Sequence, residues 1–237
     1  MITVLKHRLA IVLGHEHPLL VRAHAWRRAV MRTDQRLRRE YLRAATEPKL
    51  QIGGGWCQKE GWLNTDIMRL PNTMFMDATR RFPFDDGAFQ YILCEHMIEH
   101  VSYENAGIML RECHRVMRAF GVIRIITPDL RAMLGLHATT LTARQQAYID
   151  YFCAAHLPGK RCASAANVIN GQMRMWGHQF VYDEETLAAA MARAGFRSIA
   201  RKRLGDSDYG PLRNIENEKR YPPGLLDFES LALEGSK

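Results

Sequence analysis

The strongest constraint on the fold of this chain is a run of three glycines that follows a short apolar segment. Residues 49–52 are typical of a buried β-strand. The glycines after it are Gly53, Gly54 and Gly55. Glycine permits backbone angles that side chains disfavour, and it lets a ligand lie directly against the main chain. The pattern predicts a strand followed by a ligand-binding turn, although a glycine triplet alone also occurs in ordinary turns.

Two aspartates follow at the ends of the next two predicted strands. Residues 62–66 predict a strand that ends at Asp66, and residues 73–76 predict a strand followed by Asp77. A carboxylate at the end of such a strand can accept hydrogen bonds from ribose hydroxyls. A dinucleotide fingerprint would place its acid about 20 residues after the glycines, and Asp66 comes much sooner. The pattern therefore favours an adenosine-bearing cofactor other than a nicotinamide dinucleotide.

Sequence blocks further along the chain resemble successive motifs of the class I S-adenosylmethionine-dependent methyltransferases. The resemblance runs from about residue 50 to residue 196, in the family's order and spacing. It implies an α/β, Rossmann-like fold with a mainly parallel seven-stranded sheet and an antiparallel last strand. The blocks are DAT at 77–79, FPFDD at 82–86, FQYIL at 89–93, EHMIEHV at 95–101, ECHRVMRAFG at 112–121, IITPDL at 125–130, GHQFVYD at 177–183 and AGF at 194–196.

Two positions depart from the family's pattern. Gln51 stands where the family usually has an acid, and Cys57 replaces the third glycine. The first crossover, residues 53–61, is also too short for a full helix, so we expect a loop with Trp56 and Lys59 instead. This shortened crossover resembles a subgroup associated with polysaccharide and cell-surface glycan assembly. We expect the methionine end of the cofactor pocket to differ most from the family.

The resemblance implies which residues hold S-adenosylmethionine and its product S-adenosylhomocysteine. The glycine turn would contact the methionine part, and Asp66 would bind the ribose hydroxyls. Asp77 and the amide of Ala78 would face the adenine edge. Glu95 and His96 follow the fourth predicted strand, and they would lie beside the methionine part and the reacting methyl group.

Methyl transfer to a hydroxyl requires aligned reactants and a base that takes the hydroxyl proton. His96 and His178 are the leading candidates, because neutral imidazole is available near neutral pH. Asp129 is the third candidate, either as a base or as a ligand of a divalent cation such as magnesium, an arrangement similar to some sugar O-methyltransferases. His100 and Tyr182 are weaker candidates.

Residues 96–100 also match the H-x-x-E-H pattern of zinc peptidases. In those enzymes the pattern lies on a long helix and a third residue completes the metal site. Here it directly follows a predicted strand, within a series of methyltransferase-like blocks. The methyltransferase interpretation is therefore preferred.

Strands and helices alternate along the rest of the chain, which predicts a parallel sheet with right-handed crossovers. An insertion from about residue 130 to residue 178 follows the fifth strand. Ligands bind at the carboxyl ends of strands in such sheets, so we expect the insertion to cover the acceptor. The other predictions are strands at 89–94, 121–126 and 230–234, helices at 104–117, 131–136, 143–155 and 183–194, a loose segment at 157–170 and a long excursion at 205–227.

Positive charge is concentrated at the start of the chain. Residues 1–50 hold 11 lysines and arginines against 4 acids, whereas the rest holds 22 against 21. A nearly neutral body gives no strong nucleic-acid signal. Residues 1–46 predict a basic amphipathic helical extension, and residues 47–237 the methyltransferase domain. The apolar stripe of the extension would dock on the domain or on a second subunit of a homodimer, or alternatively on an anionic membrane surface.

Composition is that of a soluble globular protein, with 47% hydrophobic residues. Five cysteines without metal-like spacing indicate reduced thiols in the cytoplasm. We therefore expect a cytoplasmic S-adenosylmethionine-dependent O-methyltransferase that acts on a sugar hydroxyl of a saccharide or glycan intermediate. The alternatives are a methyltransferase for a lipid, a quinone or another small metabolite, or a non-catalytic cofactor-binding partner subunit.

Overall fold

A computed structural model shows a seven-stranded sheet with the strand order β3-β2-β1-β4-β5-β7-β6. It describes residues 33–68, 70–157, 163–216 and 221–237. Neighbouring strands from β3 to β5 are parallel, and β7 is antiparallel to both β5 and β6. The predicted sheet is therefore confirmed. The strands are β1 (Lys49–Ile52), β2 (Leu63–Asp66), β3 (Met74–Phe75), β4 (Phe89–Glu95), β5 (Met117–Pro128), β6 (Arg197–Lys202) and β7 (Ser230–Ser236).

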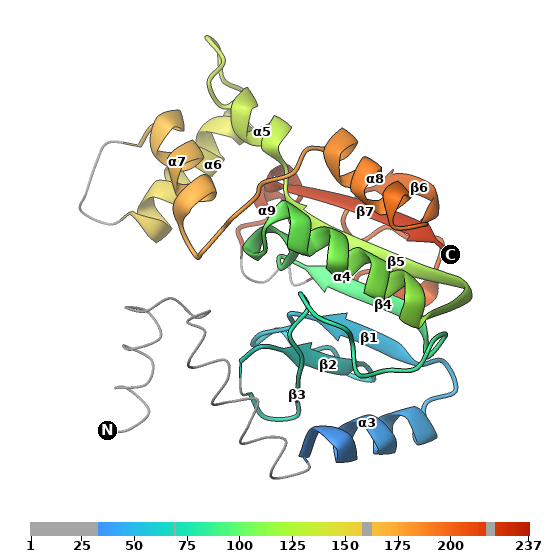
Figure 1. Ribbon diagram of the computed structural model, residues 1–237. Coiled ribbons are helices and arrows are strands. Elements are labelled where there is room, and N and C mark those ends of the chain that lie inside the picture. The colour runs from blue at the N-terminus through green and yellow to red at the C-terminus, as the bar shows by residue number, and fades with distance from the viewer. Residues whose placement is uncertain (1–32, 69, 158–162, 217–220) are drawn as a thin grey trace, which may run out of the picture.

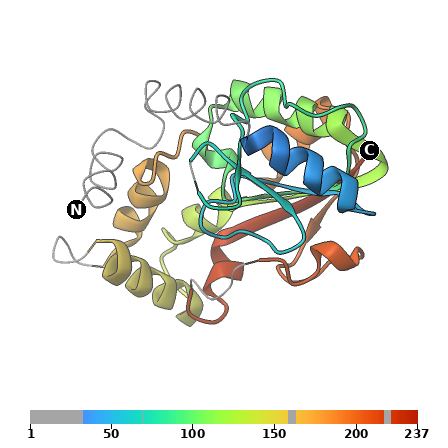
Figure 2. The same ribbon diagram turned by 90° about the horizontal axis from the view of Figure 1, so that it is seen from below.

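Three helices cover one face of the sheet, and they lie together on the upper side in Figure 2. They are α3 (Thr33–Ala44), α4 (Tyr103–Val116) and α8 (Glu184–Arg193). The opposite face is covered by the excursion after β6, which includes the 3-10 helix η2 (Gly210–Leu212). Side chains alternate between the two faces along each strand. In β4, Ile92 packs under the helices and Leu93 packs against Leu212.

Polar caps fix where the helices of the sheet begin. Ser102 accepts a hydrogen bond from the backbone of Asn105 at the start of α4. Asp183, predicted as a cap, accepts one from the backbone of Thr186 at the start of α8. Such caps satisfy amide groups that the first helical turn leaves without partners. Both helices begin within one residue of the predicted positions.

The insertion after β5 forms a small helical layer of its own, beyond the carboxyl ends of the parallel strands (Figure 1). The prediction of a loose segment at 157–170 was wrong from residue 165 onward, because Ser164 caps a helix and Val168 packs into the insertion's core. The helices of this layer are α5 (Leu130–Gly135), α6 (Ala143–His156), α7 (Ala165–Arg174) and α9 (Leu225–Glu229).

A buried polar group connects this layer to the start of β7. The hydroxyl of Tyr148 on α6 donates to the carboxylate of Glu229 on α9. Gln172 on α7 donates to both, at 2.7 Å to the Tyr148 oxygen and 3.1 Å to Glu229 Oε2. Buried polar groups that satisfy one another fix a unique arrangement. The insertion is thereby held against the strand that follows α9.

Part of the predicted amino-terminal extension is visible as α3. Leu37 and Tyr41, both from the predicted apolar stripe, pack against the core under the sheet's helices. The Tyr41 hydroxyl also accepts a hydrogen bond from the backbone of Lys49, at 2.8 Å. The first 32 residues of the extension lie outside the described residues. Among the described helices, none has the length and apolar character needed to cross a membrane.

Candidate active site

The glycine turn after β1 is built around two left-handed glycines. Gly53 has φ +65° and Gly55 has φ +50°. The Gly54 amide donates to the Thr65 carbonyl at 3.1 Å, and the Gly55 amide donates to Asp66 Oδ2 at 2.8 Å. A Cβ atom on Gly53 would lie 2.1 Å from Met97 Cγ, whereas one on Gly55 would meet nothing within 4 Å. The turn therefore holds β1 against β2 and leaves open space at Gly55.

The two aspartates lie at neighbouring strand ends, as predicted. Asp66 is buried at the end of β2, where Oδ1 accepts the Met68 amide at 2.6 Å. Asp77 follows β3, where Oδ1 accepts the Thr79 amide at 3.0 Å and Oδ2 pairs with Arg80 at 2.9 Å. The Thr79 hydroxyl also donates to Asp77 Oδ1, at 2.6 Å. Backbone amides thus fix the orientation of both carboxylates at the strand ends.

Gln51 holds the short first crossover in place. Its side chain is buried and donates from Nε2 to the Cys57 carbonyl at 3.0 Å. Its Oε1 accepts the Lys59 amide at 3.1 Å. The ammonium of Lys59 in turn pairs with Glu95 at the end of β4, with 2.8 Å between Nζ and Oε2. An amide side chain supplies both a donor and an acceptor here, which an ionised acid cannot do.

Restoring the family's acid at this position is therefore expected to harm the protein. The Gln51→Glu carboxylate would face the Cys57 carbonyl without a donor, inside the core. We expect the free energy of unfolding to fall by about 1–3 kcal/mol, the cost of an unsatisfied buried polar group. Urea denaturation measures this. The matched control is Gln90→Glu, since Gln90 makes the same kind of bond to the Phe120 carbonyl at an exposed position. Equal stability of the two variants would contradict the role of Gln51.

His96 is the first residue after β4, and its ring is fixed on both sides. The residue has φ +49°, and its amide donates to the Ile126 carbonyl at 2.8 Å. Nδ1 lies 3.3 Å from Oε1 of Glu99, and Nε2 lies 3.4 Å from the Ser230 hydroxyl. Because a non-glycine residue rarely adopts positive φ, the surrounding contacts must hold the backbone there. The result is an imidazole positioned by a carboxylate at the end of the central strands.

Glu99 is buried on the 3-10 helix η1 (Ile98–His100). Its Oε2 accepts a hydrogen bond from the Thr127 hydroxyl at 3.1 Å. Burial works to raise the pKa of this carboxyl, but the neighbouring His96, His100 and His178 bring the pKa below its usual value of 4.5. The carboxylate is thus kept ionised by the imidazoles around it.

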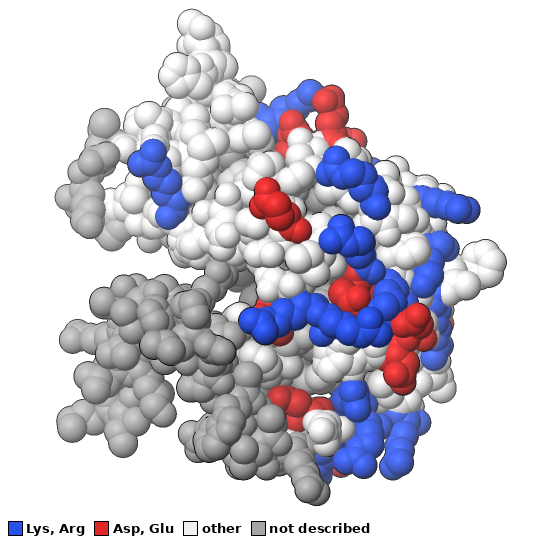
Figure 3. Space-filling model, viewed as in Figure 1, with Lys and Arg blue, Asp and Glu red and all other residues white. Residues whose placement is uncertain are grey.

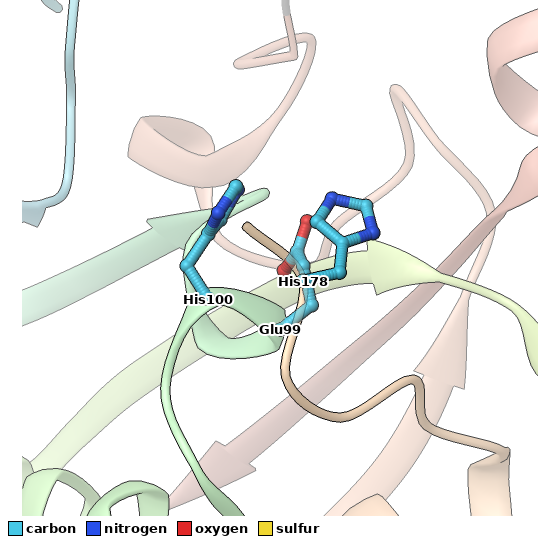
Figure 4. Close-up of side chains that lie close together, drawn as sticks. All are labelled: Glu99, His100 and His178. Atoms are coloured by element: carbon cyan, nitrogen blue, oxygen red, sulfur yellow. The ribbon is translucent and has the colours of Figure 1, made fainter. Parts of the chain in front are cut away.

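His178, the second predicted base, lies beside His100 rather than beside His96. Their rings meet edge to face with centroids 4.8 Å apart, next to Glu99 (Figure 4). His178 Nδ1 lies 2.5 Å from the Gln172 carbonyl oxygen. The following amide, of Gln179, donates to the Glu99 carbonyl at 2.7 Å. Burial lowers the pKa of His100, and the Glu99 carboxylate opposes that shift.

Asp129 is the third predicted base and a predicted metal ligand. Each of its two carboxylate oxygens interacts with another residue of the chain. Oδ1 accepts the Arg131 amide at 2.9 Å and so caps α5, while Oδ2 pairs with Arg201 at 2.8 Å. Tyr182 lies beside it, fully buried. In the described part of the chain, the acids and histidines that gather at metal-binding distance are Glu99, His100 and His178.

The residue that sequence reasoning missed is Glu99. It drew notice only within the H-x-x-E-H pattern, which here lies on a three-residue 3-10 helix after a strand. The spacing from His96 to Glu99 was the available signal. The role of Glu99 could be recognised only in the folded chain, where Thr127 of β5 and His178 of the insertion lie next to its carboxylate.

Comparisons with known proteins bear on the fold of the chain. Residues 59–125 match the family model described as "Methyltransferase domain". The crystal structure of a SAM-dependent methyltransferase from Archaeoglobus fulgidus is similar, with a TM-score of 0.50 and 19% identity over 86% of this chain and 92% of that one. The chain has the class I methyltransferase fold. A search of curated proteins gave no match.

Two other solved structures resemble the methyltransferase domain less closely. One is a SAM-dependent methyltransferase of Thermotoga maritima, described as a possible histamine N-methyltransferase, with 16% identity, TM-score 0.44, and 83% and 87% of the two chains covered. The other is phosphoethanolamine N-methyltransferase 2 of Haemonchus contortus, with 11% identity, TM-score 0.43, and 87% and 52% covered. The family match and the fold together support an S-adenosylmethionine-dependent methyltransferase.

The residues at the strand ends of the methyltransferase domain fit this cofactor. The open space at Gly55 lets a ligand lie against the main chain. Asp66 lies at the end of the adjacent strand, where a carboxylate can accept hydrogen bonds from ribose hydroxyls. Glu95, buried at the end of β4, offers a carboxylate near the same edge of the sheet. Lys59 already pairs with that carboxylate at 2.8 Å, so a charged amino group of the cofactor would share it with the Lys59 ammonium.

Proposed function

We propose that this methyltransferase domain methylates a sugar hydroxyl of a saccharide or glycan intermediate, with His96 as the general base. The observation that carries the proposal is the 3.3 Å contact between His96 Nδ1 and the buried Glu99 carboxylate, directly after β4. A carboxylate on one ring nitrogen orients an imidazole and stabilises the cation that forms when the other nitrogen takes a proton. When bound, S-adenosylmethionine supplies the electrophilic methyl group.

A hydroxyl acceptor requires such a base, because its proton must leave as the new bond forms. The Ser230 hydroxyl lies 3.4 Å from His96 Nε2, so the acceptor hydroxyl would take the place of Ser230 at this nitrogen. His96 would take the acceptor proton at Nε2, while Glu99 holds Nδ1. Asp129 contributes to this arrangement through its position under α5 and its pair with Arg201, not as a base.

The acceptor side of the proposal is supported by the surface of the insertion. Trp176 is 46% exposed, and its ring centroid lies 5.5 Å from that of His178. An exposed aromatic face next to polar side chains suits a sugar, which presents C–H groups on one face and hydroxyls at its edge. On the face seen in Figure 3, charged side chains are denser over α4 and the sheet than over the helices of the insertion, where a basic side chain is also visible. The insertion thus favours a neutral, hydroxyl-rich acceptor.

Two measurements test this function. Calorimetry with S-adenosylhomocysteine is expected to show binding at one site per chain, and no detectable binding would contradict the cofactor assignment. Mass-spectrometric screening of sugars and oligosaccharides, with and without a chelator, is expected to show addition of one methyl group. Methylation of lipids or quinones but of no saccharide would contradict the sugar acceptor and favour a lipid or quinone acceptor. Cofactor binding without any methylated product would favour a non-catalytic partner subunit.

A further inference from the structure

Glu99, His100 and His178 form a compact group of donor atoms next to the proposed base. One donor atom of each residue lies within 4.8 Å of those of the other two. The two imidazoles approach the carboxylate from opposite sides, His100 from η1 and His178 from the segment after α7 (Figure 4). Oε1 of Glu99 is buried and lies 3.3 Å from His96 Nδ1, and a carboxylate oxygen has a second lone pair that can take a further partner.

Each of the three side chains is oriented by a partner that leaves a donor atom available. His178 Nδ1 is held by the Gln172 carbonyl, so Nε2 carries the lone pair. A ring nitrogen of His100 interacts with the backbone of Trp176. The Thr127 hydroxyl binds Glu99 Oε2. Metal-binding histidines almost always have this second partner, which fixes the ring and its tautomer.

We propose that Glu99, His100 and His178 bind a first-row divalent transition-metal ion, for which Zn²⁺ is the probe. Two imidazoles and one carboxylate are the ligand set of open zinc sites with one position left for water or substrate. Mg²⁺ is disfavoured, because it takes oxygen ligands almost exclusively. In a tetrahedral site, two ligand atoms that are each about 2.0–2.1 Å from the zinc ion lie about 3.4 Å apart, so side-chain movements of about 1.5 Å would close the site.

The site joins two parts of the fold that are far apart in the chain. Glu99 and His100 belong to η1 after β4, and His178 belongs to the exit of the insertion. His100 and His178 are only partly buried, so an ion can reach them from solvent. Binding would fix the end of the insertion next to His96. The metal site does not depend on the proposed methyl transfer, since it is defined by its own ligands.

The test uses the full chain without an affinity tag, stripped of metal and kept free of cofactor and acceptor. Titration with ZnCl₂ in a calorimeter is expected to show one tight site, and titration with MgCl₂ none. Co²⁺ loading is expected to give the visible absorption of a nitrogen- and oxygen-ligated site. Zinc is also expected to raise the melting temperature, because it binds only the folded state.

The deciding variant is His178→Asn. Asparagine keeps a donor near Nδ1 for the Gln172 carbonyl and removes Nε2, so the fold is retained while a ligand is lost. Zinc affinity is expected to fall by more than about 100-fold, since loss of an outer partner alone costs 10–100-fold. The matched control is His137→Gln, at an exposed histidine after α5, which is expected to bind zinc as the unmodified chain does.

Two results would overturn the metal site. One is an unmodified chain that keeps no stoichiometric zinc after gel filtration. The other is a His178→Asn variant that binds zinc as tightly as His137→Gln. Neither result affects S-adenosylhomocysteine binding or methyl transfer, which are measured without zinc, so failure here and failure of the proposed function are distinguishable.

Discussion

Replacing His96 with asparagine is expected to lower the turnover of methyl transfer by about 10²–10⁴-fold, the usual contribution of a general base. Asparagine was chosen because it can adopt the backbone conformation of His96. His96 has φ +49°, and asparagine is among the residues that tolerate this region. Its amide group can also keep a donor toward Glu99, near the position of Nδ1. The variant therefore removes Nε2 while it preserves the local structure.

The prediction is measured as turnover at saturating acceptor, together with calorimetric affinity for S-adenosylhomocysteine. We expect the affinity to change by less than about threefold, a small effect compared with the loss of a whole binding contact. His137→Gln serves as the control and is expected to leave both quantities unchanged. Unchanged turnover of His96→Asn would remove His96 from the mechanism. Parallel loss of cofactor affinity and turnover would instead mean that the residue holds the cofactor pocket.

The second large effect concerns stability. Arg124 on β5 is fully buried, and it pairs with Glu234 at 2.7 Å and with Glu216. It also donates to the backbone carbonyls of Arg203 and Asp206, both at 2.9 Å. Arg124→Met leaves two buried carboxylates without their cation. We expect the free energy of unfolding to fall by about 3–5 kcal/mol, the cost of breaking a buried pair from one side.

Urea denaturation of Arg124→Met measures this loss, and Arg144→Met is the matched control. Arg144 pairs with Asp227 at 2.9 Å, but both side chains are largely exposed, at 47% and 40%. Exposed pairs contribute about 0–1 kcal/mol. A loss below about 1 kcal/mol for Arg124→Met would mean that the two carboxylates become protonated or hydrated at little cost. The ion pairs of Arg124 would then contribute little to holding the excursion after β6 against the sheet.

Local sequence signals predicted the elements of this fold because their causes lie within a few residues. Asp183 and Thr186 are three positions apart, so the cap of α8 is visible in the sequence. The glycine turn is equally local. The positions of Asp66 and Asp77 could be predicted because each aspartate comes at the end of a predicted strand. The mainly parallel seven-stranded sheet came from the family resemblance, and the order of its strands was not predicted, since no local pattern specifies which strands become neighbours.

The functional contacts could not be predicted because distant segments make them. His96 and Ser230 are 134 positions apart, and Arg124 and Glu234 are 110 apart. Gln51 looked like a departure from the family, and its use became clear only when the short loop folded back over it. Asp129 was proposed as a base because it follows a strand, and the structure adds that it caps α5 and pairs with Arg201. Position in the sequence thus predicted where these side chains lie, and their catalytic roles stay predictions.

The polar group of Tyr148, Gln172 and Glu229 determines how this enzyme can be recombined with its relatives. Its three members come from α6, α7 and α9, and they are separated in the chain by β6 and the excursion after it. A chimera that exchanges residues 130–174 alone would leave the Glu229 carboxylate buried without its donors. The exchangeable module is therefore discontinuous, and residues 225–229 must be exchanged together with the insertion.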